Sequence, residues 1–159
     1  MEVIIKKIKI LVVDPKAQRE WCLAPYPDHP RGCPNYGRKK GCPPHYPFIS
    51  EIFDIRKPLC AVIVKFNLRE HMDKMKKLHP EWSERQCRCC LYYQPTVNKK
   101  LREEAESILR EGKLGNKAEF GPEAAGMDMT ATCHLAGIDL EWPPQKYVCK
   151  IAFIGYALK

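Results

Sequence analysis

Apolar residues are arranged with the spacing of β-strands in three segments of this chain. Ile8, Ile10 and Val12 share one face at a period of two, with lysines on the other face. Residues 59–67 form a continuous apolar run, which is typical of a central strand buried on both faces. We therefore expect strands over residues 3–13, 59–67 and 147–158.

Between the second and third strands the apolar spacing changes to that of amphipathic helices. Leu101, Ala105 and Ile108 form one apolar stripe, and Gly112 stands where that helix should stop. The expected helices are residues 69–77, a helix that starts near Pro80, residues 97–111 and a short helix from Asp128 to Ala136. The helix from Pro80 would carry on one face Trp82, Cys89, Cys90 and Tyr93.

These elements predict one domain of α/β (α+β) class over residues 1–159, a length typical of a single domain. We expect a small sheet of about three strands with helices on one face. The helical region would span about residues 69–136. A long loop over residues 16–48, rich in cysteine and proline, would pack at one edge or end of the sheet.

The composition of this loop is its unusual feature. The chain has nine cysteines and 14 prolines, and seven of the prolines fall between Pro25 and Pro47. Nine cysteines cannot all pair as disulfides, and clustered cysteines in a reducing compartment are more often metal ligands or reactive groups. Loops this long are uncommon inside a compact domain unless they are functional or disordered, and a bound metal would organise this one.

Three cysteines in the loop, Cys22, Cys33 and Cys42, are separated by ten and eight residues. Structural zinc sites usually use cysteine pairs two to four residues apart, and this loop has none. Wide spacing suits thiolates that reach a larger object from several sides, such as an iron–sulfur cluster. Prolines after Cys33 and Cys42 stiffen the backbone, and nearby glycines allow sharp turns. Basic residues at 38–40 would offset the negative charge of a cluster, would bind a phosphate or would simply be solvated.

A fourth ligand is expected from the stretch Gln86–Cys90, with Cys90 as the first candidate because it borders the apolar face of its helix. Cys87 shares that face three residues earlier, whereas Cys89 points about 100° away. The alternative is that Cys89 and Cys90 are small buried hydrophobic residues. If the metal is zinc, His29 and His45 are the natural extra ligands. The remaining cysteines, Cys60, Cys133 and Cys149, are expected to be structural.

The loop resembles that of a family of uncharacterised predicted metal-binding proteins of archaea and anaerobic bacteria. The resemblance is carried by residues 32–38 (GCPNYGR), residues 41–44 (GCPP) and the earlier Cys22, with a second similar stretch over residues 122–130 followed by Gly137 and Ile138. It implies metal binding, most plausibly an iron–sulfur cluster, and no known reaction. Family members often have a closer first cysteine pair and a later ferredoxin-like cluster of cysteines; here only residues 87–90 correspond to that later cluster.

These observations leave two functional hypotheses from different classes. The first is a small cytoplasmic protein that holds one [4Fe-4S] cluster through Cys22, Cys33, Cys42 and Cys90. With four protein ligands the cluster would serve a redox partner or the fold; with three, an open iron would act on a small anionic substrate, and the protein would be an enzyme.

The second hypothesis is a zinc-stabilised module that binds RNA through a basic surface. The net charge is +8, and residues 65–102 contribute a net +6. Tyr26, Tyr36 and Tyr46 lie among basic residues and would stack on bases. We expect no membrane contact, because no apolar run approaches the roughly 18 residues of a membrane helix, and no secretory signal is recognisable.

Overall fold

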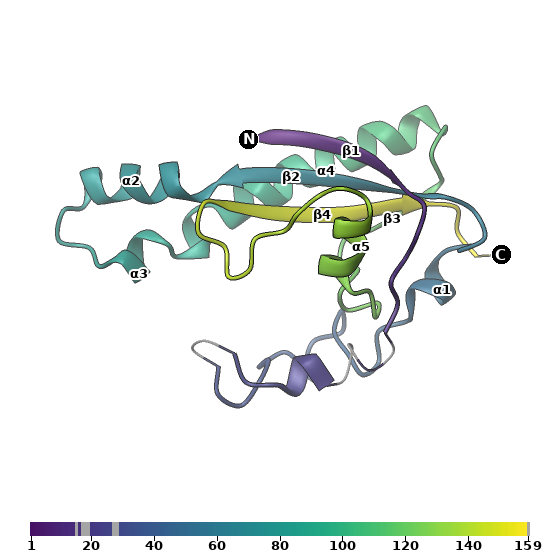
Figure 1. The fold of residues 1–159 in the computed structure, drawn as a ribbon, viewed down its shortest axis with the longest axis horizontal. Helices are drawn as coiled ribbons and strands as arrows, with labels where there is room; N and C mark the ends of the chain where they lie inside the picture. The colour runs from purple at the N-terminus through teal and green to yellow at the C-terminus, as the bar shows by residue number, and fades with distance from the viewer. Residues whose placement is uncertain (15, 17–19, 27–28, 159) are drawn as a thin grey trace.

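The computed structural model describes residues 1–14, 16, 20–26 and 29–158. It is an α+β fold built on an antiparallel sheet of four strands in the order β1-β2-β4-β3 (Figure 1). The strands are β1 (Glu2–Ile8), β2 (Leu59–Asn67), β3 (Lys117–Glu119) and β4 (Tyr147–Gly155). The helices are α1 (Ile49–Ile52), α2 (Leu68–Leu78), α3 (Glu84–Cys87), the 3-10 helix η2 (Cys90–Tyr92), α4 (Gln94–Glu111) and α5 (Met129–Leu135).

β2 is an inner strand, as its apolar sequence predicts, and it separates two hydrophobic cores. Leu59, Ala61 and Ile63 belong to one core, while Cys60, Val62 and Val64 belong to the other. Alternate residues of a strand point to opposite faces of a sheet, so a strand that is apolar at every position must be covered twice. Val62, Ile63 and Val64 are all fully buried.

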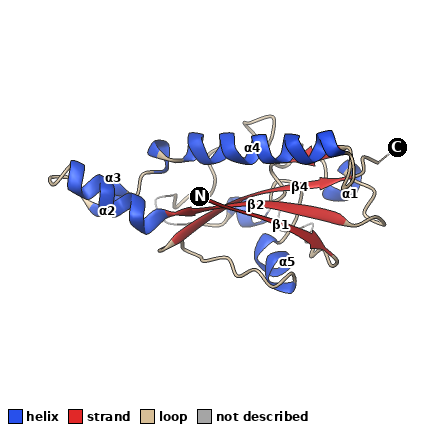
Figure 2. Ribbon diagram, turned by 90° about the horizontal axis from the view of Figure 1, so that it is seen from above, coloured by secondary structure: helices blue, strands red, loops and turns tan. Residues whose placement is uncertain are grey.

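Helices cover both faces of this sheet, so the expectation of helices on one face is wrong. α1 and α5 pack on the first core, whereas α2 and α4 pack on the second. Figure 2 shows α4 and α5 on opposite sides of the strands. Within the described part of the chain, no helix has both the length and the apolar character needed to cross a membrane.

The sheet also has one strand more than the sequence predicts. β3 is only three residues long and pairs with the end of β4, from Gly155 to Phe153. A strand this short shows no period that sequence analysis can detect.

β1 ends at Ile8 instead of near residue 13. Its partner β2 begins at Leu59, directly opposite Ile8, and the preceding Pro58 has no N–H to extend the ladder. The chain beyond Ile8 leaves the sheet, and Val13 forms an isolated bridge with Met127.

The helix expected from Pro80 is broken into two short pieces. Ser83 caps α3: its side chain accepts a hydrogen bond from the Gln86 N–H at 3.3 Å, and the Ser83 N–H donates to the Gln86 side-chain oxygen at 2.8 Å. Cys89 has φ −56° and ψ 120°, which is not helical, so the chain restarts as η2. The other three expected helices are present as α2, α4 and α5.

Candidate metal centre

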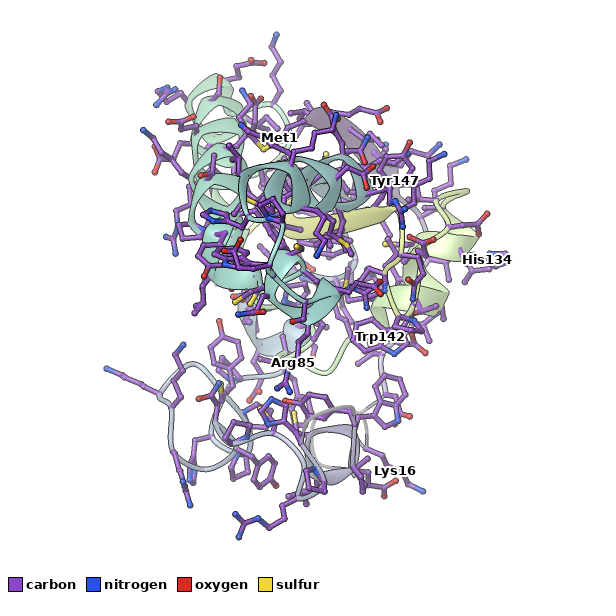
Figure 3. The ribbon with its side chains drawn as sticks, turned by 90° about the vertical axis from the view of Figure 1, so that its left-hand side faces the viewer. Met1, Lys16, Arg85, His134, Trp142 and Tyr147 are labelled. Carbon is purple, nitrogen blue, oxygen red and sulfur yellow. The ribbon has the colours of Figure 1, made fainter. Side chains whose placement is uncertain are left out.

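The cysteine loop lies beyond the β4 side of the sheet, away from β1, in the views of both Figure 1 and Figure 3. Its two ends are tied to one short segment of the chain that precedes α5. At the entry to the loop, the Asp14 N–H donates to the Gly126 carbonyl at 3.0 Å, and at its exit the Ile49 N–H donates to the Ala125 carbonyl at 2.9 Å. Both carbonyls belong to the segment of residues 122–130.

A backbone contact brings the first two loop cysteines together. A helical turn closes with the Ala24 N–H donating to the Glu20 carbonyl at 2.8 Å, and it contains Cys22. The Cys33 N–H then donates to the Cys22 carbonyl at 2.7 Å. Gly32 makes this approach possible: its φ is +76°, and an added Cβ would lie 2.7 Å from the carbonyl oxygens of Cys22 and Leu23.

A succession of tight turns then carries the chain from Cys33 to Cys42. The Tyr36 N–H donates to the Cys33 carbonyl at 3.2 Å, and the Cys42 N–H donates to the Lys39 carbonyl at 2.9 Å. A backbone hydrogen bond of 2.8 Å from the Gly37 N–H to the Pro43 carbonyl closes this part of the loop. The loop is therefore held by its own backbone hydrogen bonds, with Cys33 and Cys42 at its turns.

The three loop thiols are close enough to interact electrostatically. Burial raises the pKa of the Cys22 thiol, and the neighbouring Cys33 and Cys42 thiols raise it further. All three residues are half-buried and none is in a disulfide. Without a cation, three thiolates would repel one another; a bound metal centre would remove that repulsion and favour the deprotonated ligands.

The loop does not form a closed site for a single ion. Among the residues that the structure describes, no three side chains of His, Cys, Asp or Glu are grouped so that they hold one metal ion. The sulfurs of a tetrahedral zinc site, with Zn–S bonds of about 2.3 Å, would have to lie roughly 4 Å apart.

Cys90 and its neighbours lie on a different part of the fold from the loop cysteines. Cys90 is exposed at the start of η2, and the groups that shift the Cys22 pKa do not include it. Cys87 is only 2% exposed and packs in the second core. The expectation that Cys87 and Cys90 share a helical face is therefore wrong, because the helix ends between them.

The alternative, that Cys89 and Cys90 are small buried hydrophobic residues, is also wrong, because Cys90 is exposed and Cys89 is half-buried. The three cysteines expected to be structural do lie in or against the cores. Cys60 is 3% exposed, Cys133 is fully buried, and Cys149 packs from the rim of the first core.

Of the two candidate histidine ligands, His29 lies beside the loop and lines a cavity together with Cys33. The His29 ring lies tilted against the Tyr26 ring, with 4.6 Å between the ring centroids. The backbone N–H of His29 donates to the Tyr26 carbonyl at 2.8 Å. His45 is exposed.

Sequence reasoning missed the contact that anchors the end of the loop. The Tyr46 hydroxyl lies 2.8 Å from both carboxylate oxygens of Glu119 in β3, and Glu119 is only 6% exposed. The Gly121 N–H also donates to this carboxylate. Tyr46 is 73 residues away from Glu119, so no local pattern indicates the pair. Tyr46 is half-buried and packs against the first core.

The chain matches no protein-family model, no curated protein and no solved structure.

Proposed function

We propose that this chain is a small metal-binding protein that holds one iron–sulfur cluster, of the [4Fe-4S] type, through Cys22, Cys33 and Cys42. The observation that carries the proposal is that three free thiols lie in one loop and are near enough to interact electrostatically. The Cys33 N–H bonded to the Cys22 carbonyl holds two of them together, and the Cys22 pKa responds to both of the others.

The donor set fits a cluster in its chemistry. Thiolates are the usual ligands of iron–sulfur clusters, and three of them are delivered from separate turns of one loop. Thiolates on different irons of a cluster stand farther apart than thiolates on one zinc ion.

The rest of the loop would adapt this chain to a negatively charged centre. Arg38, Lys39 and Lys40 are exposed next to Cys42, where their charges would offset those of the thiolates and the cluster. When bound, the cluster would supply electron transfer, or Lewis acidity at an iron that lacks a protein ligand. Tyr46 and the bonds to Ala125 and Gly126 would hold the loop against the sheet.

Cys90 remains the proposed fourth ligand, with an iron open to a small molecule as the alternative. Its exposed position leaves its sulfur accessible, but coordination would require the loop and η2 to meet. Substitution of Cys90 distinguishes these two arrangements.

The test is an absorption spectrum with iron, sulfide and zinc analysis on the full chain purified without oxygen. We expect broad absorption near ~400 nm and about four iron and four sulfide per chain. Cys22→Ala, Cys33→Ala and Cys42→Ala should each lose most of the iron. Cys149→Ala is the matched control, because it removes a half-buried thiol outside the loop and should keep the iron.

The result for Cys90→Ala decides the fourth ligand: loss of iron supports Cys90, while full loading supports an open iron. A colourless protein with one zinc per chain would overturn the cluster and favour the zinc-stabilised RNA-binding module. A folded chain free of both metals would overturn metal binding altogether.

A further inference from the structure

The cysteine loop encloses a cavity of about 460 Å³ beside Cys33. This volume lies within the range of about 300–1,000 Å³ that small-molecule sites occupy. The side chains that define its character are Leu23, His29, Arg31, Cys33, Tyr36 and Arg38, with proline and glycine between them.

The charge of the cavity is one-sided. Among its described lining residues are two arginines and a histidine, and no carboxylate. Arg31 and Arg38 are both exposed, and in the described part of the chain neither guanidinium is in an ion pair. Two guanidiniums beside one cavity form a natural site for an anion, because each presents a fork of N–H donors that matches a carboxylate or a phosphate.

The cavity reaches one of the three cysteines that we propose as cluster ligands. Cys33 borders it, but Cys22 and Cys42 do not line it. A cluster held by all three thiols would therefore lie next to the cavity and share Cys33 with it, without filling it.

The lining also has an apolar part that inorganic ions do not need. Leu23 and the ring of Tyr36 stand with prolines around the cavity, beside the polar groups. Apolar walls with a few well-placed charged groups are typical of sites for small organic molecules.

We propose that this cavity binds a small organic anion, carrying a phosphate or a carboxylate group, and holds it beside Cys33 at the edge of the cluster. Arg31 and Arg38 bind the anionic group, and the apolar walls contact the body of the molecule. This inference rests on the proposed function, since it names the class of substrate that would bind beside the proposed cluster.

Binding can be measured with three probes that share an aromatic body: phenyl phosphate, phenylacetate and the neutral phenylacetamide. Calorimetric titration of the full chain, purified without oxygen, should detect one of the two anions or both, and not the amide. The stronger of the two anions identifies the anionic group. Arg31→Gln and Arg38→Gln should each weaken binding by about tenfold or more, as the loss of a charge-assisted hydrogen bond predicts.

Lys16→Gln is the matched control, because it removes one positive charge from an exposed loop position that does not line the cavity. It should change the affinity by less than about twofold at moderate salt. Equal weakening by Lys16→Gln would show general attraction to a basic loop and would overturn the site, as would the absence of binding by either anion.

Metal analysis of the same samples separates this inference from the proposed function. A protein that contains a cluster but binds neither anion overturns the cavity alone. A protein without iron that still binds an anion through Arg31 and Arg38 overturns the cluster but keeps the anion site.

Discussion

At the scale of single residues, Gly32 determines how closely Cys33 approaches Cys22. Its left-handed φ of +76° and the carbonyl oxygens only 2.7 Å from an added Cβ are independent constraints. Gly37 shares the first constraint, with φ +67°, but has open space around it. Gly41 has neither constraint.

We predict that Gly32→Ala opens the contact between the two cysteines. The left-handed conformation alone costs alanine about 1–2 kcal/mol, and the overlap with backbone oxygens adds to this. Hydrogen exchange of the Cys33 N–H should therefore become at least about tenfold faster. Gly41→Ala should leave the exchange rate unchanged, and Gly37→Ala should have an intermediate effect. Equal effects at all three positions would contradict the role of close backbone packing at Gly32.

At the scale of elements, the loop is joined to the sheet where Tyr46 meets β3. The Tyr46 hydroxyl is the side-chain donor to a Glu119 carboxylate that is almost fully buried. Burial, the hydrogen bond and the negative charge of Glu119 together raise the pKa of Tyr46 to about 12. The neutral phenol is thus favoured in the folded chain.

We predict that Tyr46→Phe lowers the free energy of unfolding by about 1–3 kcal/mol, because it leaves a buried carboxylate with one donor fewer. The unfolded chain loses the phenolic proton near pH ~10, whereas the folded chain keeps it until about pH 12. The contribution of Tyr46 to stability is therefore complete below about pH 10 and is lost as the pH rises toward 12.

Urea unfolding of the wild type and Tyr46→Phe at several pH values measures both effects. The difference between the two proteins should shrink as the pH approaches 12. Tyr92→Phe is the control, since Tyr92 is 52% exposed, and it should change stability by less than about 0.5 kcal/mol. A difference that stays constant with pH would show that the Tyr46 hydroxyl does not donate to Glu119.

At the scale of the whole molecule, the fold divides the nine cysteines into two populations. Cys60, Cys87 and Cys133 are buried in the two cores, and burial raises the pKa of Cys133 to about 11. The other six cysteines are half-buried or exposed: the three loop cysteines, Cys89, Cys90 and Cys149.

We predict that iodoacetamide labels these two populations at rates that differ by about a hundredfold or more in the folded, metal-free chain. Alkylation requires an accessible thiolate, and buried thiols in an apolar core are neither accessible nor readily ionised. Cys90 should react early, and mass spectrometry after brief labelling identifies each site. Reconstitution with iron and sulfide should protect Cys22, Cys33 and Cys42. Rapid labelling of Cys87 would show that the segment after α3 is not packed in the core.

The local pattern of the sequence determines a large part of this fold. The apolar run of β2 and the apolar stripe of α4 can each be recognised from the sequence, because the spacing of buried side chains follows from the geometry of the strand or helix. The long loop and its three cysteines are equally visible in the sequence, since composition and spacing are local properties.

Tertiary structure decides what depends on distant residues. α3 begins only after the Ser83 cap, and the non-helical backbone of Cys89 separates it from η2, so the regular spacing of Trp82, Cys89 and Cys90 does not become one helical face. The three-residue strand β3 exists only because β4 offers it an edge.

Contacts between distant residues also determine the environment of the candidate metal centre. The chemistry of Cys22, Cys33 and Cys42 follows from their identity, whereas the placement of their loop depends on hydrogen bonds from its two ends to residues 125 and 126. The Tyr46–Glu119 contact joins residues 73 positions apart. Local preferences act over a few residues and can be predicted from the sequence, whereas these contacts depend on the packing of segments that only the folded chain brings together.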